Sequence, residues 1–108
     1  MAYDEGMAQR VREIVPELAE RKMFGGLAWM VNGNMAVAVM GIGGLLVRVD
    51  PDDMEALFQE PGVGPFGREG AKPMTGFVRV EDSAVADDAE LTRWVDAGVA
   101  WAATLPPK

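Results

Sequence analysis

The sequence contains no cysteine and no histidine. Without thiols, neither disulfide bonds nor thiolate metal sites can hold the fold together, and zinc sites built from Cys and His are excluded. Serine–histidine and cysteine–histidine catalytic arrangements are excluded as well. Other nucleophiles are scarce, because the chain has one serine, Ser83, and one tyrosine, Tyr3. The 17 acidic residues leave paired carboxylates or a hard-cation site as the remaining chemistry.

A basic face is also lacking, since the 108 residues carry a formal net charge of −7. We therefore expect no direct binding of nucleic acid. Hydrophobic residues make up 49% of the chain and charged residues 25%, which is typical of a soluble globular protein. The length indicates a single domain over residues 1–108. The first residues lack the basic and apolar regions of a secretory signal, so we expect a cytoplasmic protein.

The sequence begins with a helical pattern. Met7, Val11 and Ile14 recur at helical spacing, and Pro16 follows them. This predicts a helix over residues 4–14.

A run without charged residues follows, from 23 to 47, long enough to span a bilayer. Asn32-Gly33 and the glycine-rich residues 41–44 interrupt it, and apolar residues alternate beside these turns. The pattern indicates an antiparallel meander rather than a membrane segment, with Asn32-Gly33 as a type I′ turn. The predicted strands cover residues 27–31, 34–40 and 45–49.

The second half combines two helices with one or two strands. Asp50-Pro51 is typical of a helix start and Pro61-Gly62 of a stop, which predicts a helix over residues 51–60. The predicted elements after it are a loop over 61–75 with a short edge strand near Phe66, a strand over 76–81, and a helix from Asp87 to Pro106. Because the strands are grouped, we expect an α+β domain whose antiparallel sheet carries helices on one face, in the order α-β-β-β-α-β(-β)-α.

Two patterns imitate ligand sites. Residues 62–67 match the letters G-x-G-x-x-G, but they follow a predicted helix, and Pro65 removes an N–H that a pyrophosphate would need. The acidic clusters at 50–53 and 81–88 are explained by helix starts, where first-turn carboxylates are favourable. We therefore expect no catalytic residue, no metal and no cofactor.

The predicted strand 34–40 is apolar on both faces. One face would carry Met35, Val37 and Val39, and the other Ala36, Ala38 and Met40. A sheet with helices on one side only should alternate apolar and polar residues, so the outer face needs a cover. The alternatives are a second copy or partner protein, the loop 61–75, or a small anionic ligand. The residues expected on this surface mix apolar side chains with arginine, as protein interfaces do: Met40, Leu46, Arg48, Phe77 and Arg79.

The segment KMFGGLAWMVNGNM at residues 22–35 resembles the N-terminal domain of the TfoX/Sxy family of competence regulators. The segment KPMTGFVRV at residues 72–80 and the last predicted helix extend the likeness over nearly the whole chain. The residues that carry the motif are expected to be structural, with glycines where two backbones approach closely. They are Met23, Phe24, Gly25, Gly26, Asn32 and Gly33.

The resemblance implies a small α+β domain, similar in layout to type III secretion chaperones, and a role in regulating gene expression for DNA uptake. The 108 residues contain no counterpart of the C-terminal helical domain of the full regulators, so we expect a stand-alone N-terminal-like domain. Two hypotheses of function follow. The first is a non-enzymatic regulatory domain that binds an unidentified protein partner and forms a homodimer. The second is a small-ligand or weakly enzymatic domain in which Arg48 and Arg79 clamp an anion.

Overall fold

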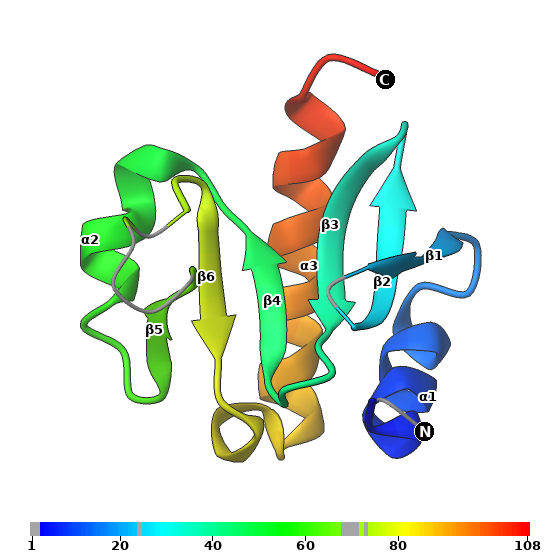
Figure 1. Ribbon diagram of the computed structural model, residues 1–108, viewed down its shortest axis with the longest axis horizontal. Helices are drawn as coiled ribbons and strands as arrows, with labels where there is room; N and C mark the ends of the chain where they lie inside the picture. Colours follow the sequence, from blue (N-terminus) through cyan, green and yellow to red (C-terminus); the bar gives the residue numbers. More distant parts are fainter. Residues whose placement is uncertain (1–2, 24, 68–71, 73) are drawn as a thin grey trace.

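The computed structural model describes residues 3–23, 25–67, 72 and 74–108 (Figure 1). Six strands form one antiparallel sheet in the order β1-β2-β3-β4-β6-β5. The mixed α+β class is as predicted, and the elements that were predicted follow one another in the expected order. In chain order the elements are α1 (Glu5–Ile14), β1 (Ala19–Met23), β2 (Gly26–Val31), β3 (Asn34–Val39), β4 (Leu45–Arg48), the 3₁₀ turn η1 (Pro51–Asp53), α2 (Met54–Leu57), β5 (Val63–Pro65), β6 (Phe77–Val80), the 3₁₀ turn η2 (Asp82–Val85) and α3 (Asp88–Thr104).

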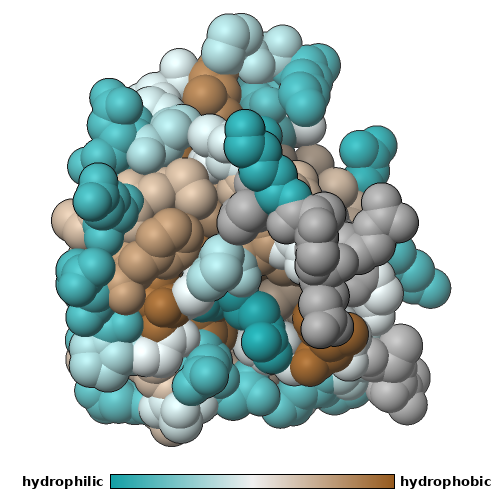
Figure 2. All heavy atoms as spheres, turned by 60° about the vertical axis from the view of Figure 1, so that its left-hand side comes forward, coloured by the Kyte–Doolittle hydropathy of each residue, from teal (hydrophilic) through white to brown (hydrophobic). Residues whose placement is uncertain are grey.

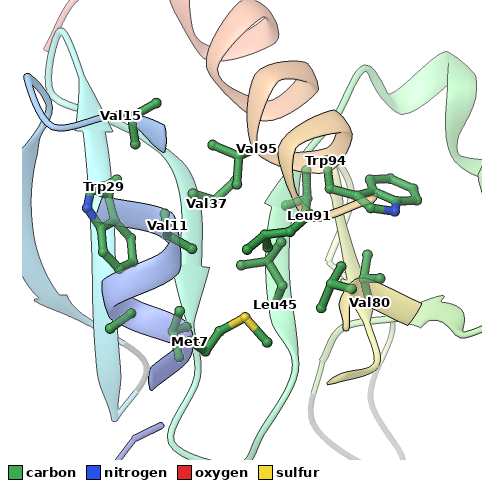
Figure 3. Close-up of a cluster of buried hydrophobic side chains, with 14 of the residues drawn as sticks. Met7, Val11, Val15, Trp29, Val37, Leu45, Val80, Leu91, Trp94 and Val95 are labelled. Atoms are coloured by element: carbon green, nitrogen blue, oxygen red, sulfur yellow. The ribbon is translucent and has the colours of Figure 1, made fainter. Parts of the chain in front are cut away.

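The helices α1 and α3 cover one face of the sheet (Figure 1). We call this the inner face. Its hydrophobic cluster joins Met7 and Val11 of α1 to Leu45 of β4 and to Leu91 and Val95 of α3, whose side chains point into one shared space (Figure 3). Burial of this apolar surface is the main force that holds the helices on the sheet.

Local signals place α1 and the first hairpin. Asp4 caps α1, because its carboxylate accepts a hydrogen bond from the Met7 backbone N–H at 3.1 Å. Asn32 and Gly33 both have positive φ, 52° and 84°, as a type I′ turn requires. The uncharged run therefore forms strands, and no helix among the described residues is long and apolar enough to cross a membrane.

Strand β1 and the helix over 51–60 differ from the prediction. Strand β1 was not expected, because its residues are exposed or half-buried and carry charges on both faces, which leaves no alternation to detect. The helix predicted over 51–60 is shorter in the structure. Before Pro61, the backbone N–H groups of Gln59 and Glu60 donate to the carbonyls of Ala56 and Leu57, three residues back, as in a 3₁₀ helix. The predicted edge strand is present as β5, just before Phe66.

A β-bulge in β3 corrects the predicted faces of that strand. Trp29 of β2 pairs with Val37, but the next residue, Met30, pairs with Met35, so Ala36 is an extra residue. Met35 consequently lies on the outer face with Ala38 and Met40, not on the inner face with Val37.

Candidate functional site

The face of the sheet opposite α1 and α3, which we call the outer face, carries a second hydrophobic cluster. Its buried members are Ala28, Met35, Ala38, Met40, Leu46 and Phe77, and Met23, Met30 and Phe66 pack half-buried around them. Four of the eight methionines of the chain belong to this cluster. The prediction that the sheet is apolar on both faces is therefore confirmed.

The centre of the outer face is covered within one copy of the chain. Met40 is 1% exposed and Leu46 is fully buried, although both were expected on an interaction surface. Phe77 is 8% exposed. The part of this surface that a partner can reach is its rim, where Met23, Met30 and Phe66 are half-buried. Met74 adjoins this rim, since its backbone N–H donates to the Phe66 carbonyl at 2.7 Å, and it is 39% exposed. We refer to these four residues, together with Arg48, as the outer rim.

Arg48 and Phe77 form a stacked pair on this surface. They lie opposite each other in the β4–β6 register, and the Arg48 guanidinium carbon is 4.9 Å from the centroid of the Phe77 ring. This is the distance of a cation–π contact. Arg48 is half-buried, so its side chain stacks on the ring while remaining partly exposed.

Arg79 has a different role. Its Nε and Nη2 atoms donate to the Gly43 carbonyl at 3.2 and 3.1 Å, in the turn that precedes β4. The same turn is held by Asp82, whose carboxylate accepts from the Gly44 backbone N–H at 3.0 Å. Arg79 therefore fastens the β3–β4 turn.

The two arginines are not brought together as a clamp. Arg48 lies at the end of β4, whereas Arg79 reaches the turn before β4 begins. A depression of about 310 Å³ beside Arg79 is also lined by Glu81, whose carboxylate would repel an anion. This arrangement does not favour the anion-binding hypothesis.

The motif residues hold the hairpins together. A side chain at Gly26 would place its Cβ 1.8 Å from the Val39 carbonyl oxygen, so β2 and β3 approach here as closely as the sequence led us to expect. Gly25 has a φ of 68°, which favours glycine. Met23 lies on the outer face, and Phe24 falls outside the described residues.

Asn34 is a buried polar residue that the sequence analysis did not single out. It is 2% exposed, and its side-chain amide donates to the Pro106 carbonyl at 3.0 Å. The Lys108 backbone N–H donates to the Asn32 carbonyl at 2.9 Å, so the residues after α3 are joined to the β2–β3 turn. An asparagine beside a turn glycine gives no sequence signal for such a long-range contact.

Among the described residues, no three carboxylates lie close enough together to hold a metal ion.

Comparison with known proteins agrees with the motif. No curated protein matches the chain. The TfoX N-terminal domain matches over residues 10–102, which includes every strand and most of α3. The chain therefore belongs to the TfoX N-terminal domain family.

Proposed function

We propose that this protein is a non-enzymatic regulatory domain that acts through protein contacts, as a competence-regulator-like domain would. Membership of the TfoX N-terminal domain family supports this proposal, since that family is not known for enzymatic activity. The composition supports it as well, because a chain without His or Cys lacks the usual groups for acid–base and nucleophilic catalysis.

We further propose that the contacts include self-association through the outer rim. The observation that carries this step is the composition of the rim, in which three methionines, one phenylalanine and a stacked arginine surround an apolar centre. Methionine and aromatic residues together with arginine are enriched in protein interfaces. Methionine side chains also adapt readily to a partner surface.

Light scattering across a micromolar range of protein concentration tests this proposal. We expect the wild type to pass from monomer to dimer as the concentration rises. Arg48→Glu and Met74→Glu should each raise the dissociation constant about tenfold, because a carboxylate at the rim must be desolvated on association.

Ala100→Glu is the matched control for Met74→Glu, since it adds the same single negative charge at an exposed position on α3. It should leave the dissociation constant unchanged. A wild type that remains monomeric at every concentration, or a control that weakens association as much as the rim variants, would contradict self-association through the rim.

A further inference from the structure

A groove on the helical side of the sheet lies between α3 and two other segments, residues 49–62 and residues 81–84. It consists of two adjoining depressions, one of about 480 Å³ and one of about 200 Å³. Both are lined by Arg93 and Trp94 of α3, which therefore lie at the boundary between them. We call the two depressions together the α2–α3 groove.

The larger depression is acidic. Glu60, Glu81 and Glu90 line it, and Arg93 is the one basic residue among its lining residues. Two further carboxylates, Asp50 and Asp53, line the smaller depression. The groove thus carries five carboxylates against one guanidinium. These residues come from the two most acidic stretches of the chain, residues 50–60 and 81–96.

The smaller depression also has an apolar wall. Leu57 of α2 and Trp101 of α3 are half-buried there, and Ala97 lies exposed between the helices. On the neighbouring side of the molecule, viewed from α2 and β5, apolar side chains also gather in a patch with hydrophilic ones around it (Figure 2). An acidic compartment next to an apolar one favours a ligand that has both a cationic and an apolar part.

The side chains of the groove already hold one cationic group, the guanidinium of Arg93. Its guanidinium carbon is 4.7 Å from the centroid of the Trp94 ring, and its Nη2 donates to Glu60 at 2.8 Å and to Glu90 at 2.9 Å. The hydrogen bond from Arg93 lowers the pKa of the Glu90 carboxyl. Both carboxylates remain partly exposed, with side-chain exposures of 36% for Glu60 and 44% for Glu90, so they can accept a second cation from outside.

We propose that the α2–α3 groove binds a basic amphipathic segment of a partner protein. Its Lys or Arg side chains lie among Glu60, Glu81 and Glu90, and its apolar side chains pack on Leu57 and Trp101. From Glu90 to Trp101 the helix rises about 16 Å at 1.5 Å per residue, the length of about five extended residues or three helical turns. Because this groove is on the helical side and the outer rim is on the other, the segment and a second copy of the chain can bind independently.

Nuclear magnetic resonance titration of the full chain tests the proposal. The probe is a short synthetic peptide of lysine and leucine, patterned as an amphipathic helix. We expect backbone shifts at residues 50–60, 81–84 and 90–101 and a shift of the Trp101 indole signal. Trp29 is an internal reference, since it is fully buried in the inner cluster and its indole signal should not move. Binding should weaken as salt is raised.

Two double variants with the same change of charge separate the groove from the general acidity of the chain. Asp53→Asn/Glu81→Gln removes carboxylates that line the groove, and we expect the dissociation constant to rise about tenfold. Glu55→Gln/Asp96→Asn alters exposed residues that do not line it and should leave affinity nearly unchanged. Trp101→Ala tests the apolar wall and should also weaken binding about tenfold.

A scrambled peptide of the same composition should bind more weakly than the patterned one. The proposal is overturned if both peptides bind equally, if the two double variants weaken binding to the same extent, or if the shifts map to β1 or to the outer rim. Absence of binding at low salt overturns it as well.

Discussion

Single residues decide how closely the helical layer can approach the sheet. A Cβ on Gly98 of α3 would lie 2.6 Å from the Ala36 carbonyl oxygen and 2.9 Å from a methyl group of Val37. Ala36 is the extra residue of the bulge in β3, so the bulge and the glycine of the helix meet at one point. The absence of a side chain at residue 98 therefore allows α3 to pack directly on the β3 backbone.

Gly98→Ala should consequently destabilise the protein. Helix propensity alone would make alanine more favourable by about 1 kcal/mol, but the added methyl group meets backbone atoms that cannot move aside cheaply. We expect the free energy of unfolding to fall by about 2 kcal/mol, measured by urea denaturation. Gly64→Ala is the control, because nothing lies within 4 Å of its Cβ position. Equal stability of the Gly98 variant and the wild type would contradict this account.

Between elements, an ion pair joins α1 to the edge strand β1. Arg12 donates to Glu20 from Nε at 2.6 Å and from Nη2 at 3.1 Å, a bidentate arrangement. The hydrogen bond from Arg12 is the main cause that lowers the pKa of the Glu20 carboxyl, and the nearby Trp29 indole lowers it further. That indole N–H is buried and faces β1 without a hydrogen bond of ordinary geometry (Figure 3). The pair thus contributes to holding β1 beside α1.

The contribution of this pair should depend on pH in a definite direction. Because the pKa of Glu20 is lower in the folded than in the unfolded chain, the stabilisation is present above the ordinary glutamate value of 4.5 and is lost as pH falls through the lowered pKa. Both side chains are about one-third exposed, so we expect Glu20→Gln to cost only about 0.5 kcal/mol at neutral pH.

Urea denaturation at several pH values measures this effect. The difference between wild type and Glu20→Gln should shrink as pH falls below 4.5. Glu17→Gln makes the same change of charge at an exposed position before β1 and serves as the control. A difference that grows at acidic pH would refute the assigned sign.

At the scale of the whole molecule, one sheet separates two hydrophobic clusters. Leu45 lies in the inner cluster and Leu46 in the outer one, and both are fully buried within a single copy of the chain. The outer cluster is therefore part of the folded core at its centre and can serve for association only at its rim.

Leu46→Ala should accordingly destabilise the monomer. Removing a fully buried leucine side chain typically costs 2–5 kcal/mol, and we expect Leu45→Ala to cost about the same. Denaturation at dilute and at concentrated protein distinguishes a cover within the chain from one supplied by a second copy. The loss for Leu46→Ala should be the same at both concentrations, as for Leu45→Ala. A loss that changes with concentration only for Leu46→Ala would show that a partner buries the outer face.

Where local signals are strong, the elements agree with the sequence-based expectations. The cap at Asp4, the turn at Asn32-Gly33 and the stripe of α3 act over a few residues, so their patterns predict structure directly. Strand β1 was missed because an edge strand exposed on both faces has no alternation. The side on which Met35 lies was also wrong, since a bulge shifts the alternation of all residues beyond it and arises from pairing with β2.

The candidate site, too, was predicted only in part. Composition indicated an apolar outer face containing Met40, Leu46 and Phe77, and these residues are there. Their burial and the different partners of Arg48 and Arg79 could not be predicted from the sequence, because each depends on segments far apart in the chain. The α2–α3 groove was not expected either, since its lining combines residues from 49 to 62, residues from 81 to 84 and residues of α3.

The sequence by itself determined the kinds of element, the excluded chemistries and the two-sided apolarity of the sheet, since these depend on residue identity and short-range spacing. The tertiary structure decided which apolar residues stay accessible, where each arginine is held, and where acidic and apolar side chains meet in a groove. Those properties depend on distances between residues remote in sequence, and only packing of the folded chain sets such distances.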